Sequence, residues 1–323
     1  VNMNSMFHNI IGFNQDVGGF DVSNVETANQ AFAVSSNLGE GIGSFNNGGS
    51  DNIKNWDTSS LVSAQIMFGN TKFNQDISTW DVSNLEKATF MFSSCVDFNQ
   101  DLSSWNTASL RRARGTFVKT AINFNLNNWD FSSVESLRRF VQSASNYNNG
   151  GQPINWNTTA ALTNTSSMFS NATAFNQPIA MDVSGVINAS SMFEGANIFN
   201  QNLDNLDFLS LKNADEMFRL ATSFNNGNPA GNPGTLNWTT APITECKRMF
   251  NNAVSFNCNI LPLDFSEATD FTFMFRSADS YNNGGVSLNG FESNFQAGQS
   301  YQFSGMFNRT SYNQPLDAWG DEL

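Results

Sequence analysis

One pattern recurs along the whole chain, and its clearest copy is Phe73-Asn74-Gln75-Asp76-Ile77-Ser78-Thr79-Trp80-Asp81-Val82-Ser83-Asn84-Leu85, with Met91-Phe92 following. Its first landmark is an aromatic residue followed by Asn, at Phe13, Phe73, Phe98, Phe124, Phe175, Phe199, Phe256 and Tyr312, and in an Asn-Asn-Gly form at Phe45, Tyr147, Phe224 and Tyr281. Its second landmark is a Phe usually preceded by Met, at Phe7, Phe32, Phe68, Phe92, Phe117, Phe140, Phe169, Phe193, Phe218, Phe250, Phe275 and Phe307. Such self-similarity predicts a repeat protein of about twelve units of roughly 25 residues.

Each unit holds a strand pattern and a helix pattern. Trp80-Asp81-Val82 alternates as a short strand would. The same place is taken by Trp56, Trp105, Trp129, Trp156, Trp238 and Trp319, with Phe20, Met181 and Leu206 as substitutes. Ser83-Asn84 resembles a helix N-cap. The apolar residues that follow lie three or four positions apart, as on one helical face: Leu85, Ala88, Met91, Phe92 and Cys95.

A unit this small cannot enclose a core alone, so the units must stack. We therefore expect an α/β solenoid over residues 1–323, resembling leucine-rich repeats, with a parallel sheet on one side and short helices or 3₁₀ turns on the other. Helices need more lateral room than strands, so the stack should curve with the sheet on its concave side. The Phe landmark should form an aromatic spine and the Asn landmark an amide ladder. Units after about residue 265 are degenerate.

Composition excludes several classes of partner. The 323 residues carry a net charge of −13 and only 13% charged residues. A negative field repels nucleic acid and anionic lipid surfaces, and no apolar run is long enough to span a membrane. The cysteines do not form a disulfide framework. Cys95 and Cys246 stand where other units have small buried residues, whereas Cys258 stands where several have Gln and is expected to be exposed.

The string at residues 73–85 with Met91-Phe92 resembles the leucine-rich-like repeat of BspA-type surface proteins, which also occurs in mycoplasma lipoproteins. Residues 13–25 and 98–110 resemble it almost as closely. The resemblance implies a leucine-rich-repeat-like solenoid that is extracellular and often linked to adhesion. It supplies no catalytic residues.

The sequence offers no catalytic site. His8 is the single histidine and stands beside no expected nucleophile. No zinc spacing and no phosphate-binding loop is present. We therefore expect no enzyme and no cofactor.

A column of carboxylates could bind calcium, which prefers oxygen ligands. The candidate ligands are Asp21, Asp57, Asp81, Asp130, Asp182 and Asp207. In the alternative interpretation each Asp bonds N–H groups of its own turn, assisted by Ser23, Ser83 and Ser132.

Five of the nine arginines lie close together: Arg111, Arg112, Arg114, Arg138 and Arg139. Stacked coils would superpose them into a basic patch that could bind an acidic partner or a neighbouring copy. The alternative is a solvated face in which they pair with Glu86, Asp130 and Glu135.

The function predicted is that of a non-enzymatic, surface-exposed repeat protein for adhesion or partner binding, with a protein or glycan ligand. Its location would be extracellular or at the cell surface. The alternative is a structural component of a larger assembly, such as a virion fibre, appendage or sheath, located at the virion surface. One feature supports this alternative: no polar capping unit is visible at either end, and uncapped ends invite stacking of copies.

Overall fold

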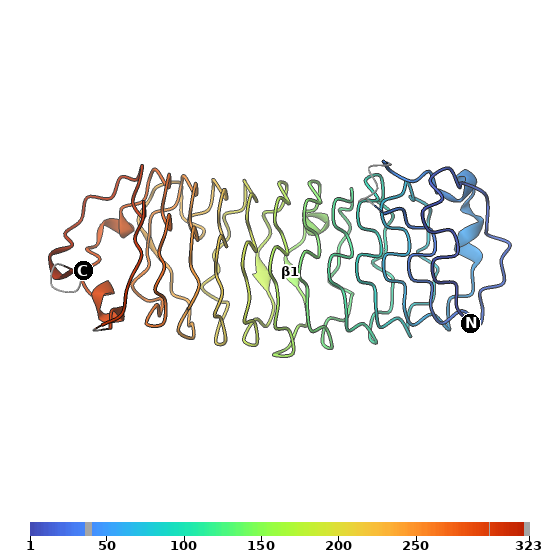
Figure 1. Ribbon diagram of the computed structural model, residues 1–323, viewed down its shortest axis with the longest axis horizontal. Helices are drawn as coiled ribbons and strands as arrows, with labels where there is room; N and C mark the ends of the chain where they lie inside the picture. Colours follow the sequence, from blue (N-terminus) through green and yellow to red (C-terminus); the bar gives the residue numbers. More distant parts are fainter. Residues whose placement is uncertain (36–40, 297, 320–323) are drawn as a thin grey trace.

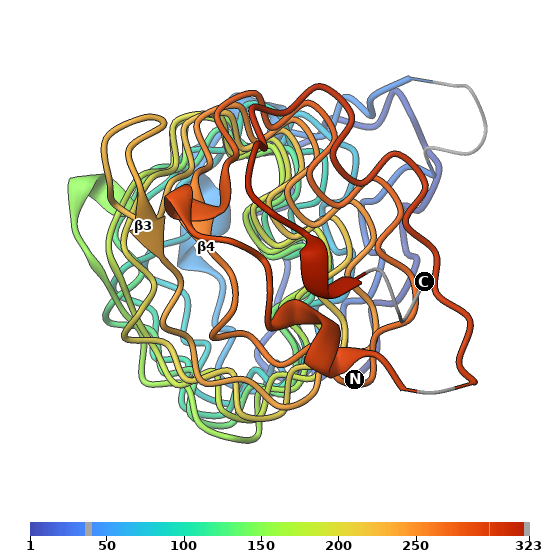
Figure 2. The same cartoon turned by 90° about the vertical axis from the view of Figure 1, so that its left-hand side faces the viewer.

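The computed structural model describes residues 1–35, 41–296 and 298–319. Figure 1 shows an elongated body in which coils of the chain follow one another along the long axis, with the two termini at opposite ends. Figure 2 looks along this axis and shows the coils superposed around a common interior. The chain is thus a repeat protein, as the recurring pattern predicts.

Regular secondary structure is sparse. Two parallel sheets of two strands each are formed by β1 (Ile154–Asn155) with β2 (Ile179–Ala180) and by β3 (Gly234–Thr235) with β4 (Cys258–Asn259). The 3₁₀ helices are η2 (Asn47–Gly49), η3 (Asp51–Asn55), η4 (Asn149–Gly151), η5 (Asn283–Gly285), η6 (Phe291–Asn294) and η7 (Asp317–Trp319). Three of them, η2, η4 and η5, lie in the Asn-Asn-Gly variants of the repeat. None of the six takes the place of the helix expected in each unit.

Residues 85–95, where a short helix or 3₁₀ turns were expected, form a run of turns and no helix. Within the run, Met91 N–H donates to Ala88 O at 3.0 Å and Ser93 N–H donates to Phe90 O at 3.1 Å. The intervening N–H groups reach the next coil instead, as when Phe90 N–H donates to Arg114 O at 2.8 Å. The apolar spacing of three and four is satisfied equally by a helix and by such turns. The helical interpretation could not tell them apart.

These turns form a long series of backbone bridges, on the side where short helices or 3₁₀ turns were expected. Parallel bridges join one residue of each successive coil in the order Asn2, Thr27, Ser63, Lys87, Arg112, Ser136, Asn164, Asn188, Asn213 and Glu245, and a further bridge joins Asp270 to Gln302. We refer to this side as the turn face. A layer of helices would have forced the stack to curve, and the described residues contain none.

The turn face uses left-handed backbone at regular intervals. Positive φ angles recur four residues apart within a coil, for example at Phe90 (55°) and Ser94 (62°), and at Ile66 (57°) and Asn70 (56°). Residues with a side chain adopt this region at a cost of about 1–2 kcal/mol each. The side chains of Phe90 and Ile66 are only partly buried. The strain therefore belongs to the coil geometry and not to core packing.

The Phe landmark forms the expected aromatic spine. Phe193 stacks on Phe169 at a centroid distance of 5.6 Å and on Phe218 at 5.4 Å. The second aromatic column lies beside it, with Phe199 at 4.2 Å from Phe193. Between Phe117 and Phe140 the parallel stacking gives way to an edge-on pair at 72°. Offset-stacked and edge-on pairs are both favourable, so the spine stabilises the stack through this change.

The Asn landmark forms an unbroken ladder from side chain to backbone. In each step the Asn Oδ1 accepts the backbone N–H of the next Asn, at 2.7–3.2 Å. The order is Asn14, Asn46, Asn74, Asn99, Asn123, Asn148, Asn176, Asn200, Asn225, Asn257, Asn282 and Asn313. The ladder corrects one register. Ile122-Asn123 takes the place assigned to Phe124-Asn125, because buried Ile122 fills the aromatic position.

The Trp column is joined by its indole N–H groups. Trp80 Nε1 donates to Ile53 O at 2.9 Å, and the same bond to the preceding coil recurs at Trp56, Trp105, Trp129 and Trp319. The indole nitrogens of Trp156 and Trp238 are buried without a partner. Met181 and Leu206 are buried and fill the column as expected, but Phe20 is 39% exposed and does not.

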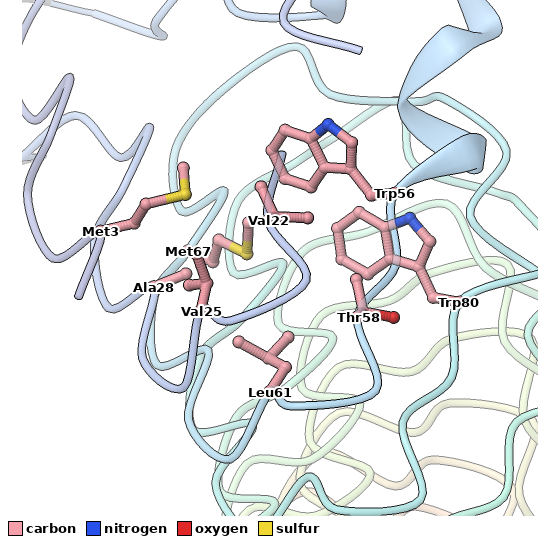
Figure 3. A pocket seen from close by; sticks show the side chains of 9 residues that line it. All are labelled: Met3, Val22, Val25, Ala28, Trp56, Thr58, Leu61, Met67 and Trp80. Carbon is pink, nitrogen blue, oxygen red and sulfur yellow. The ribbon is translucent and has the colours of Figure 1, made fainter. Parts of the chain in front are cut away.

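A small apolar cavity lies beside the two Trp rings nearest the N-terminus. Figure 3 shows its lining, in which Trp56 and Trp80 face Val22 and the methionines Met3 and Met67. Its volume is only about 10 Å³, roughly one water. Since Phe20 points away from the column, we read the cavity as a packing defect and not as a ligand pocket.

Candidate functional site

The five clustered arginines lie on the turn face of two adjacent coils. Arg111, Arg112 and Arg114 belong to one coil, and Arg138 and Arg139 to the next. A parallel bridge between Arg112 and Ser136 joins these coils, as does a bond from Gly115 N–H to Arg138 O at 2.9 Å. We call these five residues the arginine patch.

The arginine patch is not neutralised by any carboxylate of the described residues. Among the described residues, no ion pair joins its members to a carboxylate, so the expected pairing with Glu86, Asp130 and Glu135 does not form. Glu135 does help to line a shallow hollow with Arg111, Arg112 and Arg114. The only carboxylate of that hollow thus stands near the arginines without pairing with them.

Three of these guanidinium groups repel one another in partly buried positions. Burial lowers the pKa of the Arg138 guanidinium, and the charges of Arg114 and Arg139 lower it further. The Nε–H groups of Arg114 and Arg139 are buried and have no acceptor in the described structure. Arg114 also lies over the Phe90 ring, with its Cζ 5.2 Å from the centroid. A carboxylate or phosphate oxygen would satisfy these donors and relieve the repulsion.

The Asp column follows the interpretation in which each carboxylate bonds its own turn. Asp57 Oδ1 accepts the Ser59 hydroxyl at 2.6 Å and the Ser59 N–H at 3.1 Å. The same backbone bond, from the residue two positions on, occurs at Asp21, Asp81, Asp130 and Asp182. Asp207 makes no such bond in the described structure. The described residues contain no group of three or more His, Cys, Asp or Glu side chains placed to hold a metal ion, so the calcium hypothesis gains no geometric support.

Comparison with known proteins places these coils in a family. The family described as "Mycoplasma protein of unknown function, DUF285" matches residues 1–50, 44–153, 148–232 and 228–322, which together span almost the whole chain. The chain belongs to this family. No curated protein and no solved structure matches it. Within this DUF285 chain, no helix of the described residues is long and apolar enough to cross a membrane.

The single histidine of this DUF285 chain does have a nucleophile beside it, contrary to expectation. His8 Nε2 lies 3.2 Å from Ser35 Oγ. In the described residues no carboxylate is hydrogen-bonded to the His8 ring, so the pair lacks the third group that orients a catalytic histidine. The sequence hid this contact because the two residues lie 27 positions apart.

The cysteines of this DUF285 chain are all buried, which confirms the expectation for Cys95 and Cys246 and corrects it for Cys258. The Cys258 thiol lies 3.4 Å from Asn225 Oδ1. In other coils a Gln side chain donates to this position of the Asn ladder, as Gln201 does to Asn176. Burial raises the pKa of Cys95 and of Cys258 to about 12. These thiols are therefore unreactive near neutral pH.

The Asp column makes stability depend on pH. The Ser59 hydroxyl and then the Ser59 N–H lower the pKa of Asp57. Together they outweigh the raising effects of desolvation and of the charges on Asp81 and Asp21. A carboxyl with a lowered folded-state pKa stabilises the fold above its ordinary pKa, and this contribution is lost as the pH falls through the lowered value. The melting temperature should therefore fall as the pH drops below about 5.

Asp-to-Asn substitutions test whether the Asp column causes this pH dependence of stability. Asn106 already occupies this position in one coil and accepts the Ala108 N–H at 3.2 Å. The triple variant Asp21→Asn, Asp57→Asn, Asp81→Asn should keep the turn bonds and show a shallower acid transition. The same measurement in chelator tests calcium: an unchanged melting temperature would contradict the metal hypothesis, and a fall would support it.

Proposed function

We propose that the chain is a non-enzymatic, surface-exposed repeat protein that binds an acidic partner through the arginine patch. It would be a leucine-rich-repeat-like solenoid of about twelve units, of the BspA type that its sequence resembles. Its place would be extracellular or at the cell surface. The partner would be a protein or glycan with exposed carboxylate, sulfate or phosphate groups.

One observation carries this proposal: a cluster of unpaired guanidinium groups in a strongly acidic chain. The net charge is −13, yet Arg114, Arg138 and Arg139 lie together with two buried Nε–H groups that have no acceptor. Keeping like charges together without a partner lowers stability. This loss of stability is expected at a site where a ligand supplies the opposite charge.

An array of acidic and neutral glycans and peptides tests the proposal. We expect binding to acidic members only, weakening as salt screens the charges. The variant Arg114→Gln, Arg138→Gln, Arg139→Gln should bind at least tenfold more weakly. A control that removes the same charge elsewhere, Lys54→Gln, Lys212→Gln, Lys247→Gln, should bind as the wild type does. Equal losses in both variants, or binding indifferent to both, would overturn the role of the patch.

A further inference from the structure

The four arginines outside the arginine patch also lie together. They are Arg219, Arg248, Arg276 and Arg309, and they line one open, polar hollow on the turn face near the C-terminal end, with Glu216, Asn251, Asn252 and Ser277. Every arginine of the chain therefore belongs to one of two clusters. The second cluster escapes a reading of the sequence because its members come from successive coils, 29, 28 and 33 residues apart.

The cluster carries an excess of positive charge. Arg248 pairs with Glu216 at 3.2 Å, and Arg219 pairs with Glu194 and lies 3.7 Å from Glu216. Four arginines against two glutamates leave a net charge of +2. Among the described residues no carboxylate pairs with Arg276 or Arg309. These two groups supply the uncompensated charge.

The hollow is organised before any ligand arrives. Two guanidinium groups lie over the Phe273 ring, with Arg276 Cζ at 4.9 Å and Arg248 Cζ at 5.7 Å from its centroid. Cation–π contacts of this kind restrict the rotation of both side chains. The Asn252 amide donates to Asn251 Oδ1, which holds neutral polar groups at the wall. The donor groups are therefore already positioned, so ligand binding costs these side chains little conformational entropy.

We propose that this hollow binds a phosphoryl dianion, either free phosphate or the phosphate group of a monoester. A dianion matches the local charge of +2, whereas a single carboxylate would leave one charge unbalanced. Guanidinium forks fit phosphate oxygens in bidentate geometry. A long polyanion is disfavoured because the rest of the chain is acidic, while a small dianion senses mainly charges within a Debye length of about 8–10 Å.

Titration with inorganic phosphate at about pH 8 tests the proposal, since a phosphoryl group carries nearly two charges there. Phosphate should raise the melting temperature and give a calorimetric isotherm, while chloride and acetate at the same ionic strength should not. The variant Arg276→Gln, Arg309→Gln should bind at least tenfold more weakly. The control Lys54→Gln, Lys72→Gln, which removes the same charge outside both arginine clusters, should bind phosphate normally. No difference between phosphate and chloride, or equal losses in the two variants, would overturn the site.

A change of opposite sign separates a charge-based site from a structural role. Glu216→Gln frees Arg248, while Arg219 keeps its pair with Glu194. The local positive charge rises by one, so phosphate should bind more tightly. A weaker affinity in this variant would contradict the proposal. Phosphoserine and glucose 6-phosphate then identify the source: binding comparable to that of free phosphate supports a site for phosphorylated groups, and binding of free phosphate alone supports a site for the ion. The acidic-array experiment uses other residues, so either site can fail without the other.

Discussion

Replacing Phe193 with alanine should lower the free energy of unfolding by about 3–5 kcal/mol, the usual cost of removing a buried phenyl ring. The Phe193 ring is fully buried. It has a neighbour in the coil before, a neighbour in the coil after, and Phe199 within its own coil. Three aromatic contacts are lost at once, and the cavity opens in the middle of the spine. Urea unfolding followed by Trp fluorescence measures the change.

Phe20→Ala is the matched control for this prediction. Its ring is 39% exposed and lies outside the Trp column, so the loss should stay below about 1 kcal/mol, as for most surface substitutions. A repeat protein can also unfold in parts. The Phe193 variant should therefore broaden or divide the transition, whereas the control should not. Equal losses in the two variants would show that ring stacking does not stabilise the coils.

Replacing Asn225 with alanine should lower the free energy of unfolding by about 3 kcal/mol, at roughly 1 kcal/mol for each hydrogen bond lost. Asn225 is fully buried. Its Oδ1 accepts the Asn257 N–H at 2.8 Å, and its Nδ2 donates to Pro229 O at 2.7 Å and Asn232 O at 2.9 Å. Thermal unfolding should show the loss, while alanine at the exposed Asn128 should change little.

Asn225→Asp separates the two roles of this side chain. Aspartate keeps the acceptor for Asn257 N–H but places a carboxylate against the two carbonyl oxygens. Burial and repulsion would raise the pKa of this carboxyl, so the variant should gain stability as the pH falls through the raised value. A variant whose stability loss does not change with pH would contradict the donor role of Asn225.

The sequence revealed those features of the fold that depend on residue identity at a fixed period. The aromatic spine and the Asn ladder follow from repeated Phe and Asn positions, because identical side chains stack when coils are in register. The register failed only at Ile122-Asn123, where a nearby Phe124-Asn125 offers the same two-residue signal. The structure resolves the choice through Asn123, which bonds to Asn99 and Asn148 in the ladder.

The sequence did not reveal how the backbone of the turn face is built. Leu85, Ala88 and Met91 have helical spacing, yet alternate N–H groups from Ala88 to Ser94 bond to the next coil. Left-handed backbone at Phe90 or Ile66 carries no residue signal, since such side chains usually avoid this region. Neighbouring coils impose this backbone geometry, so the sequence of a single unit does not indicate it.

The candidate sites also differ in how far the sequence predicts them. The arginine patch was visible because its members are close in sequence, and the structure brings them together. The cluster at Arg219, Arg248, Arg276 and Arg309 appears only when the chain is folded at its repeat period. His8 and Ser35 likewise meet across one coil. Long-range juxtaposition was therefore the information missing from the sequence.

The turn face joins its coils through main-chain atoms, and many of its side chains project outward. Main-chain atoms therefore hold the coils together, whereas side-chain atoms determine the chemistry of the surface. Arginine, threonine, aspartate or lysine can occupy equivalent positions, as Arg114, Thr89, Asp215 and Lys247 do, without disturbing the rings beneath. A chain built this way can acquire a new binding specificity by exchanging surface residues one coil at a time, at little risk to its folding.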